Sequence, residues 1–307
     1  MEAQVLKSEL AGMWYPEDPE ELAREIDVYL AAVESGPANQ VMALLLPHAG
    51  YRYSGMVAAH GVKQVEGKSF SRVVVIGPSH RVALMDAVSI PDITAIETPL
   101  GRIGIDRDLA ERLWEDELFE SHLHAHTHEH SVQIELPFLQ RALGEFKLVP
   151  IVCGHLGEVA AKRIAATLLD HIDEETLVVI SSDFTHYGRT FDYVPFRDDI
   201  QENLRKLDLG AFKEIEDKNL SGFMDYVNNT GATICGRSPI AVLLAMLPDE
   251  ARVQLLKYDT SGNLTGDWSH CVSYISAAVT GQWKPSCSDG LHCEPKQELS
   301  ASDKIGL

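Results

Sequence analysis

Four short apolar runs constrain the fold more than any other feature of the sequence. They lie at residues 41–46, 73–76, 148–152 and 177–180, and they are rich in Val, Ile and Leu. None alternates polar with apolar residues, which is typical of strands buried on both faces of a sheet. Helical patterns separate them, so we expect an α/β fold with three layers, α/β/α, around a mainly parallel or mixed central sheet.

Helix and strand signals complete this outline. Asp18 and Ser238 are predicted N-caps, each followed by a proline at the first helical position, for helices at 19–33 and 239–247. Further helices are predicted at 106–114 and 158–169, and strands at 253–258 and 272–279. Residues 1–283 are therefore predicted to form one domain. The polar residues 284–307 are predicted to be a flexible tail.

Charge and composition exclude several classes of function. The 307 residues include 46 acidic and 26 basic ones, which gives a formal net charge of −20. Such a surface repels phosphate backbones and acidic lipids, so neither nucleic acid nor a membrane is an expected partner. No apolar run has the length of a membrane helix, and residues 1–10 lack a signal peptide, which predicts a cytoplasmic protein. The five Cys residues do not suggest a disulfide framework.

Histidines follow the predicted strands at the points where they end. His48, His80 and His186 come shortly after three of the apolar runs, and His155 follows the fourth. Ligands in open α/β sheets bind beyond the carboxyl ends of the strands, so parallel strands would bring these imidazoles together. Imidazole is the commonest metal ligand in proteins. The alternative is that each is an ordinary loop or core histidine, which is the interpretation we keep for His155.

Two more residues extend this predicted site. Asp183 lies three residues before His186, and on one turn its carboxylate would accept the ring N–H and orient His186 as a general acid/base. The alternative for Asp183 is a helix N-cap. Cys235 precedes a predicted helix and Arg237, both of which favour a thiolate that would complete a site begun by two histidines. Two His and one Cys suit iron, copper or zinc. The alternative for Cys235 is a buried core residue.

A second group of histidines occupies residues 122–130, where five alternate along the chain. On an extended strand they would share one face. His126, Glu129 and His130 also match the H-x-x-E-H order of some zinc peptidases, which requires a helix. Ser131 is the predicted N-cap of a helix at 132–143, which places the motif in a loop. We therefore expect a solvated histidine-rich loop, with His130 facing the strand-end cluster.

Short motifs recur along most of the chain. They are MWYP at 13–16, PHAGY at 47–51, GPSH at 77–80, ETPLG at 97–101, EHS at 129–131, SSDFTHYG at 181–188, ICGR at 234–237 and YDTSG at 258–262. Together these motifs resemble the Memo family (mediator of cell motility), whose bacterial and archaeal members are called AmmeMemoRadiSam system protein B. The resemblance runs from about residue 13 to about residue 278.

This resemblance implies a fold similar to the class III extradiol (LigB-like) dioxygenases. It implies that His48, His80 and Cys235 bind a metal, iron or copper, and it puts Asp183 and His186 where those dioxygenases have a catalytic histidine. Cys235 stands where the dioxygenases have a carboxylate, which departs from their pattern. Gln133 and Glu135 stand in the reverse order to typical Memo sequences, so contacts with a substrate there are expected to differ.

Three functions follow as hypotheses. The first is a mononuclear iron or copper redox protein, of a non-haem iron dioxygenase-like type, in which His186 and Asp183 are catalytic and His130 positions a small-molecule substrate. The second is a non-enzymatic interaction or signalling adaptor of the Memo type. The third is a metal-handling protein. The family name also implies partnership with radical-SAM and Amme-type proteins, and the residues leave open whether the chain is an enzyme.

Overall fold

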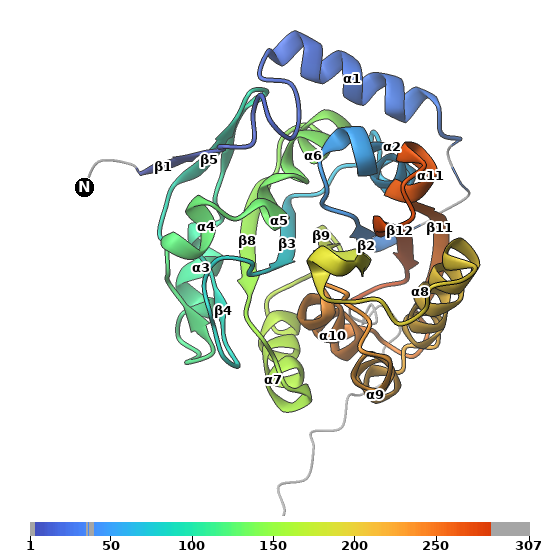
Figure 1. Cartoon of the computed structure of the whole chain (residues 1–307). Helices are drawn as coiled ribbons and strands as arrows, with labels where there is room; N and C mark the ends of the chain where they lie inside the picture. Colours follow the sequence, from blue (N-terminus) through green and yellow to red (C-terminus); the bar gives the residue numbers. More distant parts are fainter. Residues whose placement is uncertain (1–3, 35, 37–39, 284–307) are drawn as a thin grey trace, which may run out of the picture.

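Figure 1 shows the computed structural model, which describes residues 4–34, 36 and 40–283. Its main sheet has the strand order β10-β12-β2-β9-β3-β8-β4-β7, and β11 pairs with β12. The strands are β2 (Val41–Leu46), β3 (Arg72–Pro78), β4 (Val88–Ser89), β7 (Phe119–Glu120), β8 (Lys147–Cys153), β9 (Thr176–Ser181), β10 (Asp183–Gly188), β11 (Arg252–Thr260) and β12 (His270–Thr280).

The four predicted apolar strands form the middle of this sheet. Strands β2, β9, β3 and β8 lie side by side and are all parallel. At one edge β12 runs antiparallel to β2, β10 and β11, and at the other β4 runs antiparallel to β8. The sheet is therefore mixed with a parallel centre, and the predicted fold class is confirmed.

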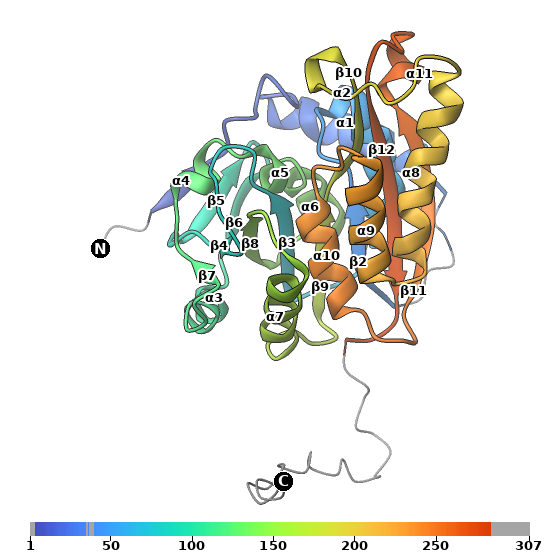
Figure 2. The same cartoon turned by 60° about the horizontal axis from the view of Figure 1, so that its bottom comes forward.

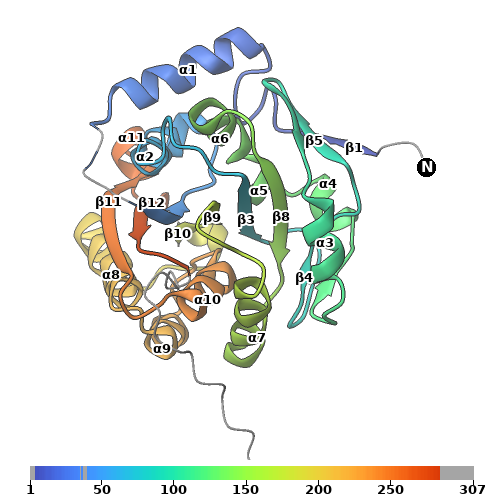
Figure 3. The same cartoon turned by 180° about the vertical axis from the view of Figure 1, so that it is seen from behind.

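The absence of alternation in these strands follows from burial on both faces. In β3, Val74 and Ile76 belong to one hydrophobic core, whereas Val73 and Val75 belong to the other. The first core packs against α3 (Arg107–Leu113), α7 (Glu158–Leu169), α8 (Ile200–Glu216), α9 (Leu220–Thr230) and α10 (Arg237–Met246). The second packs against α1 (Pro19–Ala31), α2 (Tyr51–Val62) and α6 (Leu136–Leu143). Figures 2 and 3 show the helices on the two sides of the sheet.

Shorter elements lie around these layers. A small sheet of β1 (Val5–Lys7), β5 (Ala95–Thr98) and β6 (Gly101–Gly104) lies beyond β8, on the far side from α8 (Figure 3). The remaining elements are α4 (His124–Thr127), α5 (His130–Gln133), the 3₁₀ turn η1 (Arg189–Phe191) and α11 (Ser261–Thr265). None of the helices in the described part of the chain combines the length and apolarity that crossing a bilayer demands. The predicted tail at 284–307 lies outside the described residues.

Of the three predicted N-caps, Asp18 is confirmed, whereas Ser238 and Ser131 are wrong. Asp18 caps α1 by accepting the backbone N–H groups of Glu20 and Glu21. Ser238 is not a cap, because α10 begins at Arg237 and the Ser238 hydroxyl instead accepts the N–H of Leu156. The single helix predicted at 132–143 is two short helices, α5 and α6.

The N-cap of α5 is Glu129 rather than Ser131. The Glu129 carboxylate accepts the backbone N–H of Ser131, so the residue predicted as the cap lies inside the first turn. A glutamate is an uncommon N-cap, which is why the pattern favoured the serine. This change of boundary places Glu129 beside the strand ends.

Candidate metal centre

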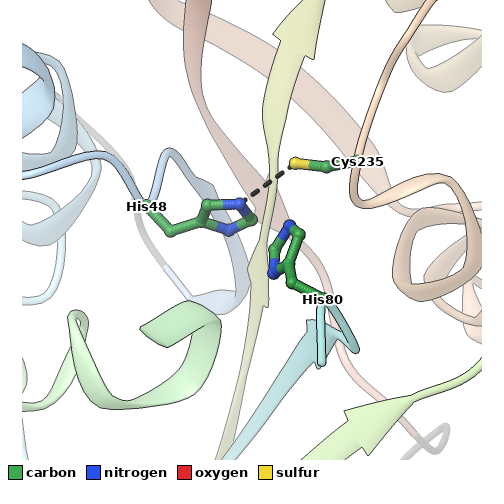
Figure 4. Close-up of side chains that lie close together, drawn as sticks. All are labelled: His48, His80 and Cys235. Carbon is green, nitrogen blue, oxygen red and sulfur yellow. Dashed lines mark hydrogen bonds between the residues drawn. The ribbon is translucent and has the colours of Figure 1, made fainter. Parts of the chain in front are cut away.

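Two histidines and one cysteine meet at the carboxyl edge of the parallel strands. His48 follows β2, His80 follows β3, and Cys235 precedes α10. One ligand atom from each lies within 4.8 Å of the others. The Nε2 atom of His48 lies 3.0 Å from the Cys235 Sγ, and the two imidazole rings are 5.3 Å apart at an angle of 85° (Figure 4). The convergence expected from the strand order is therefore present in the fold.

The ring of His48 is held by a chain of hydrogen bonds behind it. His48 is 1% exposed, and its Nδ1 lies 2.9 Å from the Ser181 hydroxyl. That hydroxyl donates to the buried Glu135 carboxylate at 2.9 Å, so its oxygen is free to accept the Nδ1–H of His48. This tautomer leaves the Nε2 lone pair facing Cys235. Burial, with the neighbouring histidines, lowers the pKa of His48 well below its ordinary value, so the ring is neutral.

The ring of His80 is held by a carboxylate directly. Glu129 accepts the His80 backbone N–H at 2.6 Å and lies 2.8 Å from its Nδ1. Burial opposes the charge on Glu129, but the hydrogen bond and charge of His80 outweigh it and lower the pKa of the carboxyl to about 2. The ionised carboxylate can only accept, so Nδ1 carries the proton and Nε2 is free. The His80 side chain is 29% exposed and forms the open side of the cluster.

The Cys235 sulfur is enclosed by backbone groups of β10. It accepts the N–H of Asp183 at 3.2 Å and lies 3.3 Å from the Asp183 carbonyl oxygen. Burial, followed by the Asp183 carboxylate, raises the pKa of the thiol well above its ordinary value. The expectation that the helix start and Arg237 would favour a thiolate is therefore wrong for the protein alone, because desolvation outweighs both.

Asp183 and His186 do not form the predicted pair. Both belong to strand β10, with an irregularity between them, rather than to one turn. The Nδ1 of His186 lies 3.0 Å from the Phe184 carbonyl oxygen and 3.1 Å from that of Thr233, so these two carbonyls orient the ring. Asp183 instead accepts the backbone N–H of His48 at 2.8 Å, and burial raises its pKa to about 7.

His130 lies against the cluster, as the sequence predicted. Its ring stacks on His80 with centroids 4.4 Å apart and meets His48 edge-on at 5.2 Å. On its other side it stacks on Trp14 at 4.5 Å. Burial, followed by His80, lowers the pKa of His130 to about 4. Trp14 belongs to the MWYP motif, but nothing in that motif indicated a contact with a histidine more than a hundred residues away.

The other histidines at 122–130 have separate roles. His126 is 3% exposed, and its Nε2 lies 3.1 Å from the Ser89 carbonyl oxygen. The expected solvated loop is thus wrong for His126, whereas His122, His124 and His128 are exposed. A short helix, α4, replaces the extended segment that would have aligned them. The prediction that the H-x-x-E-H motif lies in a loop is wrong, because His126 lies in α4 and His130 in α5, although the two histidines do not share one helix.

Two cavities share Trp14 as a lining residue. One of about 480 Å³ is lined by Trp14, Ala49, Tyr53, His270 and Tyr274, among others. The other, of about 390 Å³, is lined by residues that include Trp14, Arg81, His130 and Gln133. Both are of the size that small molecules occupy, and the second reaches the cluster through His130, which stacks on His80. His155 is exposed and is not part of the ligand cluster, as expected.

The fold and the site together define an α/β protein that has a His₂Cys cluster at the carboxyl edge of a mixed sheet. Residues 7–278 match the family model described as "Memo-like protein". The chain belongs to this family, so the resemblance found in the motifs is confirmed.

Relatives from distant organisms match nearly the whole chain. A "MEMO1 family protein" of Methanobrevibacter smithii is 33% identical, covering 88% of this chain and 98% of that protein. "Protein MEMO1" of Homo sapiens is 30% identical, covering 88% of this chain and 95% of that protein. The "MEMO1 family protein TV1383" of Thermoplasma volcanium is 31% identical, covering 91% and 99%.

A solved structure shares the fold. The "uncharacterized protein JW3007" from Escherichia coli K12 superimposes with a TM-score of 0.51 at 12% identity, covering 78% of this chain and 100% of that one. At this identity the likeness shows a common architecture and does not carry an activity across.

Proposed function

We propose that this chain binds one metal ion, iron or copper, through His48, His80 and Cys235, and acts as a dioxygenase-like redox protein on a small molecule. The observation that carries the proposal is the convergence of three donor atoms within 4.8 Å, from segments far apart in sequence. Two imidazole nitrogens and one sulfur suit iron and copper. Membership of the Memo-like family supports the same site.

The chain's own groups fit such an ion. Both histidines are hydrogen-bonded through Nδ1, which leaves Nε2 available, and the Asp183 N–H supports the sulfur. An ion bound there would supply redox chemistry and the positive charge that a buried thiolate needs. Three protein donors also leave room for a substrate.

The neighbouring residues have proposed roles in handling that substrate. His186 would accept and return a proton at Nε2, because Nδ1 is engaged by the Phe184 and Thr233 carbonyls and burial lowers the pKa of the ring, keeping it neutral. Asp183 would act through the His48 backbone rather than through His186. His130, stacked between Trp14 and His80, would position the substrate at the edge of the cavity that it lines with Arg81 and Gln133.

Anaerobic reconstitution with Fe(II), and separately with Cu(I), tests the ligand set. After desalting, the wild-type chain should retain about one ion. His48→Ala, His80→Ala and Cys235→Ala should each fall to background. His155→Ala, an exposed strand-end histidine outside the cluster, is the matched control and should bind like wild type. Unchanged metal content in the three ligand variants would refute the site.

Turnover is tested separately. Oxygen consumption by the metal-loaded chain is measured with a panel of phenols and other reduced substrates, and His186→Gln should slow any reaction found without lowering metal content. Uptake that stays at background across the panel would contradict the enzymatic part of the proposal and leave metal binding to be judged by reconstitution.

A further inference from the structure

One short segment, residues 129–135, places a glutamate side chain behind each of the two histidines. We propose that this segment fixes the tautomer of both, with Glu129 as the direct positioning residue of His80 and Glu135 as the positioning residue of His48 through Ser181. The inference rests on the proposed function, because it concerns how the ligand set is built. Neither glutamate is a ligand in this proposal.

The buried carboxylate of Glu129 accepts three hydrogen bonds, two from His80 and one from Ser131. Its Oε2 accepts the His80 backbone N–H, and its Oε1 accepts both the Nδ1–H of His80 and the backbone N–H of Ser131. The same side chain therefore caps α5 and sets the rotation of the imidazole. A carboxylate behind a histidine raises the basicity of the other nitrogen, so Nε2 of His80 becomes the stronger donor.

Glu135 reaches His48 through one hydroxyl. Glu135 is 1% exposed and lies just before α6, and its Oε1 accepts the Ser181 hydroxyl proton. With that proton committed, the Ser181 oxygen accepts from Nδ1 of His48. The two histidines are thus held in the same tautomer by different means: His80 by a charged group in direct contact, and His48 by a neutral hydroxyl that is itself oriented.

Close packing joins this segment to the strand end. The Ser131 hydroxyl donates to the Pro78 carbonyl oxygen at 2.8 Å, two residues before His80. A Cβ at Gly77 would lie 2.5 Å from the Ser131 Oγ, so only a glycine permits the approach. Glu129 is consequently fixed relative to β3 by backbone contacts as well as by its own hydrogen bonds.

The same contacts argue against Glu129 as a ligand of a second ion. His80, Glu129 and His130 do place donor atoms within 4.8 Å of one another. However, both oxygens of Glu129 already accept hydrogen bonds from the chain, and Nδ1 of His80 is committed to it. A positioning role uses every one of these contacts, whereas a metal ion bound at Glu129 would compete with them for the carboxylate oxygens.

Imidazole ¹⁵N NMR of the metal-free chain tests the inference without any metal. In the wild type, His48 and His80 should both carry the proton on Nδ1. Glu129→Gln should shift His80 toward a mixture of tautomers and leave His48 unchanged, because an amide can donate to the ring nitrogen as well as accept from it. Ser181→Ala should do the reverse. Glu9→Gln, at the exposed partner of His128, is the control and should change neither ring.

Metal affinity gives the second readout. Glu129→Gln should weaken Fe(II) binding by about 10- to 100-fold, and Ser181→Ala by a smaller factor, because only the first removes a direct charged partner. Circular dichroism checks that each variant is folded. If Glu129→Gln fails to fold, Ser181→Ala and Glu135→Gln still test the His48 half.

The outcomes separate the two proposals. Tautomers that respond as expected in a chain that binds no metal would overturn the proposed function and keep the positioning roles. The opposite outcome has two parts. The wild-type chain binds metal through His48, His80 and Cys235, but Glu129→Gln keeps both the His80 tautomer and the Fe(II) affinity of the wild type. That result would overturn this inference and keep the metal centre.

Discussion

The histidines at the strand ends differ from those at residues 122–130 in the hydrogen-bond partners and burial of their imidazole rings. His48 and His80 follow β2 and β3, two parallel strands that flank β9, and each has its Nδ1 hydrogen-bonded within the protein. The second group is denser in sequence, yet His124 is exposed and His126 is buried against Ser89. Convergence of the strands and support from neighbouring groups make a candidate site, whereas a high local count of histidines does not.

His130 lies at the border between these two regions. It belongs to the dense run in sequence, but its ring stacks on His80 because α5 begins at His130 and abuts the end of β3. A difference of a few positions along the chain therefore decides whether a histidine is buried in the core, exposed to solvent or packed against the strand-end cluster. Variants in each region test whether this difference decides where a metal ion binds.

The largest effect is expected from adding a side chain at Gly77, which lies in β3 shortly before His80. In Gly77→Ala the new Cβ would lie 2.5 Å from Ser131 Oγ and 3.1 Å from its backbone carbon. Because backbone must move, we expect the free energy of unfolding to fall by up to about 3 kcal/mol, with loss of Fe(II) binding. Urea unfolding measures the first and metal analysis the second. Gly104→Ala, with nothing within 4 Å, is the control, and equal stability of the two variants would contradict the packing argument.

His126, the buried histidine within residues 122–130, should control the stability of the fold in acid. Burial lowers the pKa of His126 to about 3, below the ordinary value of about 6.5 that applies to the unfolded chain. Between these values the unfolded chain binds the extra proton, so the free energy of unfolding falls as the pH is lowered from about 6.5 toward 3. Between pH 7 and 5 the free energy of unfolding should therefore fall by about 2 kcal/mol less in His126→Gln than in the wild type.

Urea unfolding of both chains at the two pH values measures this difference. The other buried histidines, such as His48, contribute in the same direction in both chains, so the comparison isolates His126. An identical pH dependence in the variant and the wild type would show that His126 is not held neutral by the fold.

The smallest effect is expected from the exposed histidines. His124 is exposed, and the His128 side chain, 64% exposed, pairs with the exposed Glu9 at 2.7 Å. Exposed ion pairs of this kind contribute little, so His124→Ala and His128→Ala should each change the free energy of unfolding by about 0.5 kcal/mol or less. Metal content should stay that of the wild type. A fall in bound Fe(II) in either variant would show that the histidines at residues 122–130, rather than those at the strand ends, hold the ion.

The sequence predicted the strands and their convergence because both depend on local signals. Uninterrupted apolar runs indicate strands buried on two faces, and the carboxyl ends of parallel strands lie at one edge of the sheet, which brought His48 and His80 together. Cys235 was predicted to complete the site because it precedes a helix, where a thiolate is favoured. The family resemblance supported the same three residues. These parts of the fold and the candidate site needed no knowledge of side-chain packing.

The groups that support the ligands could not be predicted in this way. Glu129 acts as an N-cap and a histidine partner at once, and Glu135 acts through Ser181 in a different strand, so neither has a local pattern. His186 takes backbone carbonyls instead of Asp183 because both residues lie in strand β10. Desolvation of the Cys235 thiol also depends on burial that only the folded chain defines.

A crystal structure of the Fe(II)-loaded chain, with anomalous data collected on both sides of the iron absorption edge, tests the central claim most directly. We expect one anomalous peak, at an iron ion bonded to His48 Nε2, His80 Nε2 and Cys235 Sγ, with Glu129 still hydrogen-bonded to His80. A peak among His122, His124 and His128, or iron bound without the cysteine sulfur, would contradict it.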